Sequence, residues 1–429
     1  MSKDQGRGAS SPQLMRRANR QALLRLALRG AAFTAADAMA ATGLTRATVL
    51  GVCAELVSAG WLEQVDGAPA GGSAQRGRPA RRYALRSAAA VLVGVDAGEH
   101  TLTARVADLC GRTLATVHHP IDQAEPDPSA DRTAMVTALI DRVLARAGVA
   151  DTPRVLTVVG VPAPVDQHGR SPHDDDFWQR MNPGFVDALS TVPQDGGPGA
   201  GPGSPTQPAA AGGAVLVEND ANLAAIAEHA GGIGPHVATL MMGERFGAGL
   251  IVDGRLLRGA SGGAGEMRFL DVALDDERGA DGVAALARRW SLEVLAGDGA
   301  LDDGAGVAAR SELARISAER ITAVDVFAAA DRGDELARAV MERIGDRLAR
   351  IAVILASLLG VETVVVAGAI ADAVEPVLER ARTRIPALTG PPHPRLVASM
   401  HGSEVVVRGA IELALARLRE DPLEYLDQG

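Results

Sequence analysis

Charge divides this chain of 429 residues into a short basic segment and a long acidic remainder. Residues 1–86 contain 13 Lys and Arg against 5 Asp and Glu, a net charge of +8. The other 343 residues contain 30 Lys and Arg against 48 Asp and Glu, a net charge of −18. The chain is also longer than one ordinary domain. We therefore expect a small module that binds a polyanion, joined to a larger soluble body.

Cysteine usage and hydropathy indicate the cellular compartment of such a chain. The two cysteines, Cys53 and Cys110, are far apart and match no metal-ligand spacing, which is typical of a reducing compartment. No apolar run approaches the roughly 20 residues of a membrane span, and the N-terminus lacks the apolar core of a secretory signal. We expect a cytoplasmic protein without a membrane partner.

The basic segment has the pattern of a helix-turn-helix. Residues 15–29 carry apolar side chains at helical spacing, and a short helix over 35–42 follows a capping Thr34. Gly43 supplies the sharp turn before a third helix over 46–60, which we place in the recognition role.

Residues 61–86 predict a two-stranded wing with an arginine-rich tip, suited to phosphates or a minor groove. The exposed start of the third helix is placed to meet base edges and nearby phosphates. A three-helix packing module with a solvated charged tail is the plainer alternative. The predicted DNA-contacting residues are Thr45, Arg46, Thr48, Arg76, Arg78, Arg81 and Arg82.

From residue 88 the pattern changes to strands alternating with helices in two similar halves, which predicts an α/β body of two lobes with a cleft between them. Asp96 and Gly98 lie in a tight turn between the first two strands, where backbone N–H groups can approach a phosphate. Residues 191–213 are a Pro/Gly/Ala-rich stretch that we interpret as a disordered surface insertion.

A strand ending in Glu-Asn-Asp runs directly into a helix in the middle of the body. This places Asn219 and Asp220 at the carboxyl end of the strand, the edge where α/β folds usually bind ligands. The alternative is helix capping, in which Asp220 or Asn222 satisfies free N–H groups. Spacing alone does not separate the two interpretations.

Five segments in order resemble the ROK family (repressors, open reading frames and sugar kinases) over about residues 88–418. They are GVDAGEHTLTARVADLCG, GVPAPVD, VENDANLAAIAE, GAGLIVDGRLLRGASGGAGE and VVVAGAIAD. The combination of VENDAN and GGAGE at this spacing is specific, whereas each glycine loop alone is not. With the winged helix in front, the chain resembles the repressor branch of that family.

The resemblance implies an α/β chain with an N-terminal winged helix-turn-helix (1–86) and a two-lobed actin-like (RNase H-like) ATPase/sugar kinase fold (88–429). It implies a first lobe over about 88–217, a second over about 218–400, and a helix over 404–418 packing back on the first.

The resemblance also assigns residues to a sugar site. In kinase members the aspartate at the position of Asp220 is the general base, and residues matching Asn219 and Glu266 contact the sugar. Arg268 is either a new ligand contact or a partner of a surface carboxylate.

Departures from the family pattern argue against catalysis. Kinase members carry a G-T-G-x-G phosphate loop, but this chain reads GERFGAG, where Glu244 would repel phosphate. The phosphate-loop remnants are Asp96, Gly98, Gly243, Gly247 and Gly249. The family's zinc-binding histidine is absent from GEMRFL, and residues 270–287 contain no cysteine. We predict no zinc, no bound ATP or Mg²⁺, and no catalytic role for Asp220.

These observations predict a transcriptional regulator, a repressor of carbohydrate metabolism genes, whose body senses a sugar or sugar derivative. Its expected partners are a double-stranded DNA operator, the sugar effector and further copies of itself, as a dimer or tetramer. One alternative is an active sugar kinase with a DNA-binding head. Another is a body that serves only for dimerisation.

Overall fold

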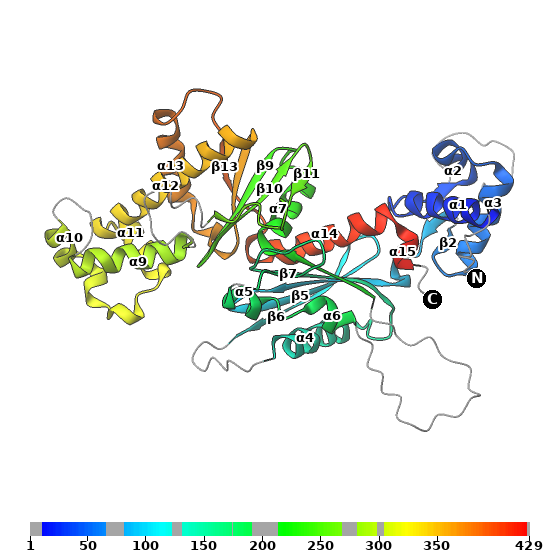
Figure 1. Cartoon of the computed structure of the whole chain (residues 1–429), viewed down its shortest axis with the longest axis horizontal. Helices are drawn as coiled ribbons and strands as arrows, with labels where there is room; N and C mark the ends of the chain where they lie inside the picture. Colours follow the sequence, from blue (N-terminus) through cyan, green and yellow to red (C-terminus); the bar gives the residue numbers. More distant parts are fainter. Residues whose placement is uncertain are drawn as a thin grey trace, which may run out of the picture.

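Two five-stranded sheets with the same topology form the body of the protein. Its computed structural model describes residues 11–65, 81–121, 131–173, 175–190, 213–267, 281–297 and 304–426. A small N-terminal head lies at one end of the molecule, and helices α9, α10 and α11 lie at the other (Figure 1). Three sets of predicted residues fall outside the described ranges: the wing-tip residues Arg76 and Arg78, Arg268, and nearly all of the predicted insertion.

The sheet of the first lobe has the order β6-β5-β4-β7-β8. Strands β4, β5 and β6 pair antiparallel, whereas β7 and β8 continue the sheet in parallel. Helices α4 and α14 both pack against β4, so this central strand is almost entirely apolar. The elements are β4 Val91–Ala97, β5 Thr101–Asp108, β6 Thr113–Pro120, α4 Arg132–Ala147, β7 Arg154–Val161, α5 Asp176–Met181, α6 Phe185–Ser190, β8 Ala214–Asn219 and α14 Val405–Glu420.

The sheet of the second lobe repeats this plan in the order β11-β10-β9-β12-β13. Again the first three strands are antiparallel and the last two are parallel. Two sheets of one topology are the duplicated unit of the RNase H-like fold, which confirms the predicted fold class. The elements are β9 Val237–Met242, β10 Phe246–Val252, β11 Arg255–Leu257, α9 Val283–Ala296, α10 Gly304–Arg310, α11 Ala323–Arg332, α12 Glu335–Leu359, β12 Thr363–Ala367, α13 Glu375–Arg384 and β13 Arg395–Ala398.

Helix α7 (Asp220–Ala230) joins the lobes because it packs against β9 and β10 on one side and α14 on another. The approach is closest at two glycines. A Cβ atom on Gly249 of β10 would lie 2.0 Å from the Ala221 carbonyl oxygen, and one on Gly409 of α14 would lie 1.8 Å from the Leu223 carbonyl oxygen. Neither position has room for a side chain.

The head is a winged helix, and capping residues mark the ends of its helices. Thr34 and Asp37 form a reciprocal capping box at the start of α2, and Gly43 ends that helix in the left-handed conformation. Thr45 caps α3 by accepting from the Thr48 N–H. The three strands pair in the order β1-β3-β2. The elements are α1 Ser11–Ala27, β1 Phe33–Thr34, α2 Ala35–Thr42, α3 Arg46–Ser58, β2 Leu62–Val65 and β3 Arg82–Leu85.

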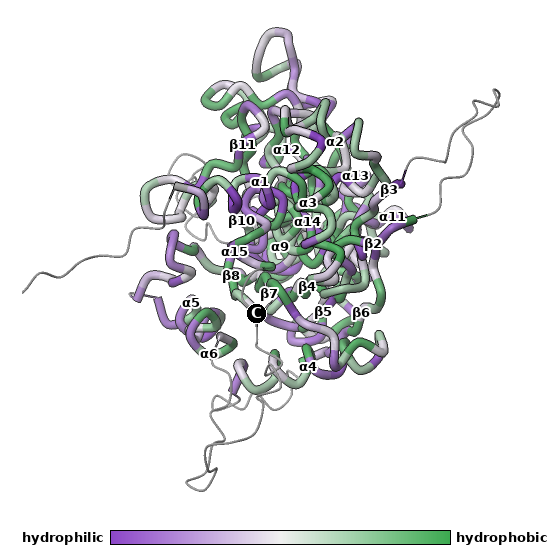
Figure 2. Tube along the Cα trace, turned by 90° about the vertical axis from the view of Figure 1, so that its right-hand side faces the viewer, coloured by the Kyte–Doolittle hydropathy of each residue, from purple (hydrophilic) through white to green (hydrophobic). Residues whose placement is uncertain are grey.

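The head is bound to the end of α14 and to the short helix α15 (Pro422–Leu426). The Gln21 side chain donates to the Asp421 carboxylate at 3.1 Å. Arg25 donates through Nε to the Glu420 carbonyl at 3.1 Å, and Arg419 donates to the Leu28 carbonyl at 3.4 Å. Apolar residues of the head belong to the same buried cluster as those of α14. Figure 2 shows the hydropathy of each residue along the Cα trace.

In the described part of the chain, no single helix combines the length and hydropathy of a membrane span. Only α2 and α3 taken together reach those limits, and they are bent by 111° at the break between them.

Candidate functional site

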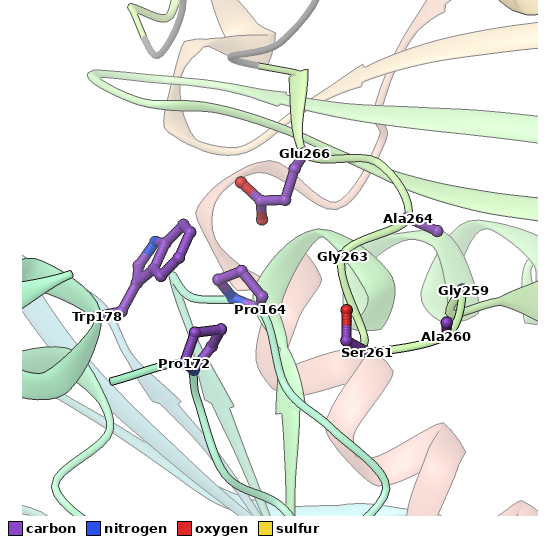
Figure 3. A pocket seen from close by; sticks show the side chains of 9 residues that line it. All are labelled: Pro164, Pro172, Trp178, Gly259, Ala260, Ser261, Gly263, Ala264 and Glu266. Atoms are coloured by element: carbon purple, nitrogen blue, oxygen red, sulfur yellow. The ribbon is translucent and has the colours of Figure 1, made fainter. Parts of the chain in front are cut away.

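A cavity of about 400 Å³ lies between the two lobes. The first lobe contributes Pro164, Pro172 and Trp178. The second contributes the glycine-rich loop over 259–264 and the side chain of Glu266, which points into the cavity towards Trp178 (Figure 3). A broad indole opposite a carboxylate suits a pyranose, which offers an apolar face and directional hydroxyl groups.

A narrower cavity of about 90 Å³ is also lined by Trp178 and Glu266 and reaches Asn219, Asp220 and Arg245. The predicted residues Asn219, Asp220 and Glu266 therefore meet in one cleft. Arg268, the fourth residue of the predicted sugar site, lies outside the described residues.

Asn219 both caps α7 and lines the cleft. Its Oδ1 accepts from the Asn222 N–H at 3.1 Å, and its Nδ2 donates to the Ala163 carbonyl at 3.0 Å. Asp220 follows as the first helical residue, and its Oδ1 accepts from the Ala221 N–H at 2.7 Å. The capping alternative named Asp220 or Asn222, but the N-cap of α7 is Asn219, and Asp220 accepts only the N–H of the next residue. Capping by Asn219 is compatible with its position in the cleft.

An ion pair that the sequence did not reveal, between the buried Glu218 and the partly exposed Arg258, holds this strand end against the glycine-rich loop. Arg258 donates to the Glu218 carboxylate through Nε at 2.8 Å and approaches it through Nη2 at 2.7 Å. The other carboxylate oxygen of Glu218 accepts from the Asn222 amide at 2.9 Å. Glu218 therefore fixes the end of β8, next to Asn219, relative to the loop that carries Glu266.

Two carboxyl groups, Asp220 of the cleft and Asp96 of β4, have pKa values far from their ordinary range. Burial, with repulsion from Asp220, raises the pKa of Asp96 to about 8, although Arg132 opposes the shift. Burial, with repulsion from Glu266, raises the pKa of Asp220 to about 7, while the hydrogen bond from Ala221 opposes it. Neutral pH therefore falls within the titration range of this acidic pair.

Replacing Asp96 by asparagine is expected to stabilise the protein at alkaline pH. Because the folded carboxyl has the higher pKa, the folded state binds more protons, and stability falls as pH rises from about 4 to about 8. Asp96→Asn should therefore gain about 4 kcal/mol in unfolding free energy at about pH 9 relative to about pH 5, measured by urea unfolding. Asp176→Asn, exposed on α5, is the control. An equal gain in that control would contradict the assignment.

The loop between β9 and β10 does not form an open phosphate cradle. The Glu244 carboxylate, which the sequence placed in the path of phosphate, instead pairs with Arg288 of α9 at 3.1 Å. Arg245 crosses the cleft, with its guanidinium carbon 3.3 Å from the centre of the Phe177 ring and Nε 3.4 Å from Glu99. Glu244 is therefore paired within the second lobe, whereas Arg245 contacts residues of the first lobe across the cleft.

The predicted phosphate-loop remnants have different surroundings. A Cβ atom on Gly243 would contact nothing within 4 Å, one on Gly247 would lie 3.6 Å from the Ala221 side chain, and Gly249 is confined by α7. Gly98 lies in the turn after Asp96, where a Cβ atom would lie 2.9 Å from the Thr101 carbonyl. Close packing therefore accounts for Gly249 and Gly98 without a phosphate.

The described residues contain no group of three or more His, Cys, Asp or Glu side chains able to hold a metal ion. Cys53 is buried in the head and Cys110 is exposed in the turn between β5 and β6. Residues 268–280, which include most of the cysteine-free stretch over 270–287, lie outside the described ranges.

The start of α3 is exposed on the head. Arg46 is exposed, and Thr45 and Thr48 bond to each other through their hydroxyl oxygens at 2.9 Å. Arg81 is exposed at the base of the wing, whereas Arg82 is half-buried and donates to the Ala32 carbonyl at 2.9 Å. Arg82 therefore ties the wing to the loop before β1.

Sequence reasoning missed Trp178 and Arg245 as lining residues of the cleft. The only available signal was that residues 173–185 diverge from the family pattern where a loop on the sugar side is expected. Arg245 belongs to the GERFGAG loop that departs from the family pattern, but its contact with Phe177 joins segments that are far apart in the chain.

Comparison with known proteins supports the same reading of the body. Residues 209–417 match the ROK family. The chain is 25% identical over 340 residues to the DNA-binding transcriptional dual regulator NagC of Escherichia coli K12, covering 77% of this chain and 75% of that protein. It is 30% identical over 183 residues to a glucokinase of Halalkalibacterium halodurans, 38% of this chain and about half (52%) of that enzyme.

A solved structure shares the whole architecture. The ROK family transcriptional regulator described as a homologue of the E. coli MLC protein superimposes with a TM-score of 0.66 at 21% identity. The match covers 96% of this chain and 99% of that one, so the head and both lobes have a counterpart.

Proposed function

We propose that this chain, which carries a ROK family domain, is a DNA-binding transcriptional regulator that represses genes of carbohydrate metabolism. The observation that carries the proposal is the winged-helix head, with an exposed start of α3, bound to a kinase-like body through α14 and α15. A basic head joined to an acidic body would bind DNA through the head alone.

The body would sense a sugar or sugar derivative in the cleft between the lobes. Support comes from Trp178, Glu266 and Asp220 on facing walls. A ligand held by both lobes would bind one lobe arrangement more tightly, and α14 connects that arrangement to the head. The regulator would act as a dimer or tetramer on a palindromic operator.

The direct experiment is selection of the full chain against sheared DNA from its own genome at moderate salt, followed by sequencing. Enrichment of a few sites that share a palindrome is expected, and the genes beside those sites would indicate the sugar. Uniform retention, or no retention, would contradict the proposal.

Replacing Trp178 by alanine is expected to weaken sugar binding by about tenfold, because the ring would supply the apolar wall. Calorimetric titration of a sugar panel into the full chain measures this. Arg180→Ala, on the same helix but exposed, should leave affinity unchanged. A body that binds no sugar at all would favour a role in dimerisation only.

An active sugar kinase is the second candidate, favoured by the pKa of about 7 at Asp220, the position of the general base in kinase members. We propose that phosphoryl transfer, bound ATP and Mg²⁺ are absent, because Arg245 crosses the cleft where phosphate would approach. We also propose that zinc is absent, because GEMRFL contains no histidine and residues 270–287 contain no cysteine. The test is sugar-dependent release of ADP. Turnover that Asp220→Asn abolishes would establish the kinase and overturn this part of the proposal.

A further inference from the structure

A third cavity, of about 280 Å³, runs along the outer edge of β8. Its floor is strand residues 215–218, and its walls are the turn over 166–169, Val186 of α6, Arg258, and Leu413 and Arg417 of α14. It shares no lining residue with the two cavities of the interlobe cleft. We call it the β8 groove.

The acidic groups of the β8 groove are already satisfied within the protein. The Glu218 carboxylate is bound by Arg258 and by the Asn222 amide. The Asp166 carboxylate accepts the backbone N–H groups of His168 and Arg170 at 2.8 and 2.9 Å, as the first residue of a tight turn. Neither carboxylate needs a cation from outside.

The hydrogen-bond donors of the β8 groove are less fully used. Arg258 meets Glu218 through Nε and Nη2. Arg417 has a weak, exposed pairing with Glu420 at 3.4 Å. Strand β8 is the last strand of its sheet, so its outward backbone groups have no strand partner among the described residues. The groove therefore offers a ligand the guanidinium group of Arg417, the remaining Nη1 of Arg258 and a strand edge.

We propose that the β8 groove is a second ligand site, for a small organic molecule that carries a carboxylate or phosphate group. Guanidinium groups bind such oxyanions through paired hydrogen bonds. The volume is slightly below the usual range of ligand pockets, and Val186 and Leu413 provide apolar walls for the rest of the molecule.

The position of the groove would link its ligand to both ends of the regulator. Arg258 directly precedes the loop over 259–264 that lines the sugar cavity. Arg417 is two residues before Arg419, which donates to the Leu28 carbonyl of the head. Ligand binding at the β8 groove does not depend on the proposed function, whereas an effect of that ligand on DNA binding rests on the proposed function.

Calorimetric titration of the full chain with citrate, glycerol 3-phosphate and inorganic phosphate tests the site. We expect saturable binding of citrate or glycerol 3-phosphate, and which of them binds identifies the oxyanion. Arg417→Glu and Gln167→Glu, both on the rim, should each weaken it by about tenfold or more, the effect of losing a charge-assisted hydrogen bond.

Two control variants locate the bound anion. Arg408→Glu makes the same charge change at an exposed position of α14 outside the groove, and should leave affinity unchanged. Arg245→Ala removes the cation of the interlobe cleft and should also leave it unchanged. No saturable binding, or equal weakening by Arg408→Glu and Arg417→Glu, would overturn the proposal. If the protein binds the anion but no operator is found, the proposed ligand site in the β8 groove is supported and the proposed function as a DNA-binding regulator is contradicted.

Discussion

Replacing Arg46 by glutamate should lower affinity for the selected operator by about 100-fold, the largest effect that we expect on DNA binding. Arg46 is the first residue of α3 and is exposed, so its side chain is available to a base edge or phosphate. Reversing its charge removes a favourable contact and adds repulsion from the phosphate backbone. Fluorescence anisotropy at several salt concentrations measures both the affinity and a shallower dependence on salt.

Arg29→Glu is the matched control for that substitution. Arg29 is exposed on the same head, but it follows Leu28, whose carbonyl is bound by Arg419 of the body. It therefore directly follows a contact between the head and α14 in the chain and lies outside α3. Equal losses in the two variants would mean that overall charge, and not the start of α3, governs binding.

Replacing Gly249 by alanine should destabilise the fold by about 3 kcal/mol, because the new Cβ atom would lie 2.0 Å from the Ala221 carbonyl oxygen. Strand β10 would have to move away from α7, which packs against both β10 and α14. Chemical unfolding of the full chain measures the loss, with the midpoint shifting to lower denaturant.

Gly243→Ala, in the same loop motif, is the control for Gly249→Ala. Its Cβ atom would meet nothing within 4 Å, so stability should change by less than about 1 kcal/mol. Similar stability in both variants would mean that α7 and β10 adjust easily, and that packing does not explain Gly249.

Local chemistry made much of the fold predictable. Thr34 and Thr45 begin helices of the head and Gly43 ends one, as the capping rules predict, because those rules depend on residues three or four apart. The apolar strand over 91–97 and the strand-to-helix junction at Asn219 were likewise legible, since each is a short pattern within one segment.

Contacts between the lobes were not predictable in this way. Glu218 and Arg258 are 40 residues apart, and Arg245 reaches Phe177 across the cleft. A single sequence shows the residue types but not which of them the fold brings together. For this reason Glu244 was assigned to the phosphate path, although its carboxylate pairs with Arg288.

The attachment of the head to α14 affects the order in which parts of the protein fold during synthesis. Gln21 and Asp421 are in contact although 400 residues separate them, and α14 also covers β4 and β7 of the first lobe. While the chain is emerging from the ribosome, one face of the first sheet therefore stays uncovered until α14 and α15 have been synthesised. A chain that terminates early would carry an intact recognition helix on an incomplete body, and exposure of that apolar face would direct it to chaperones and proteases.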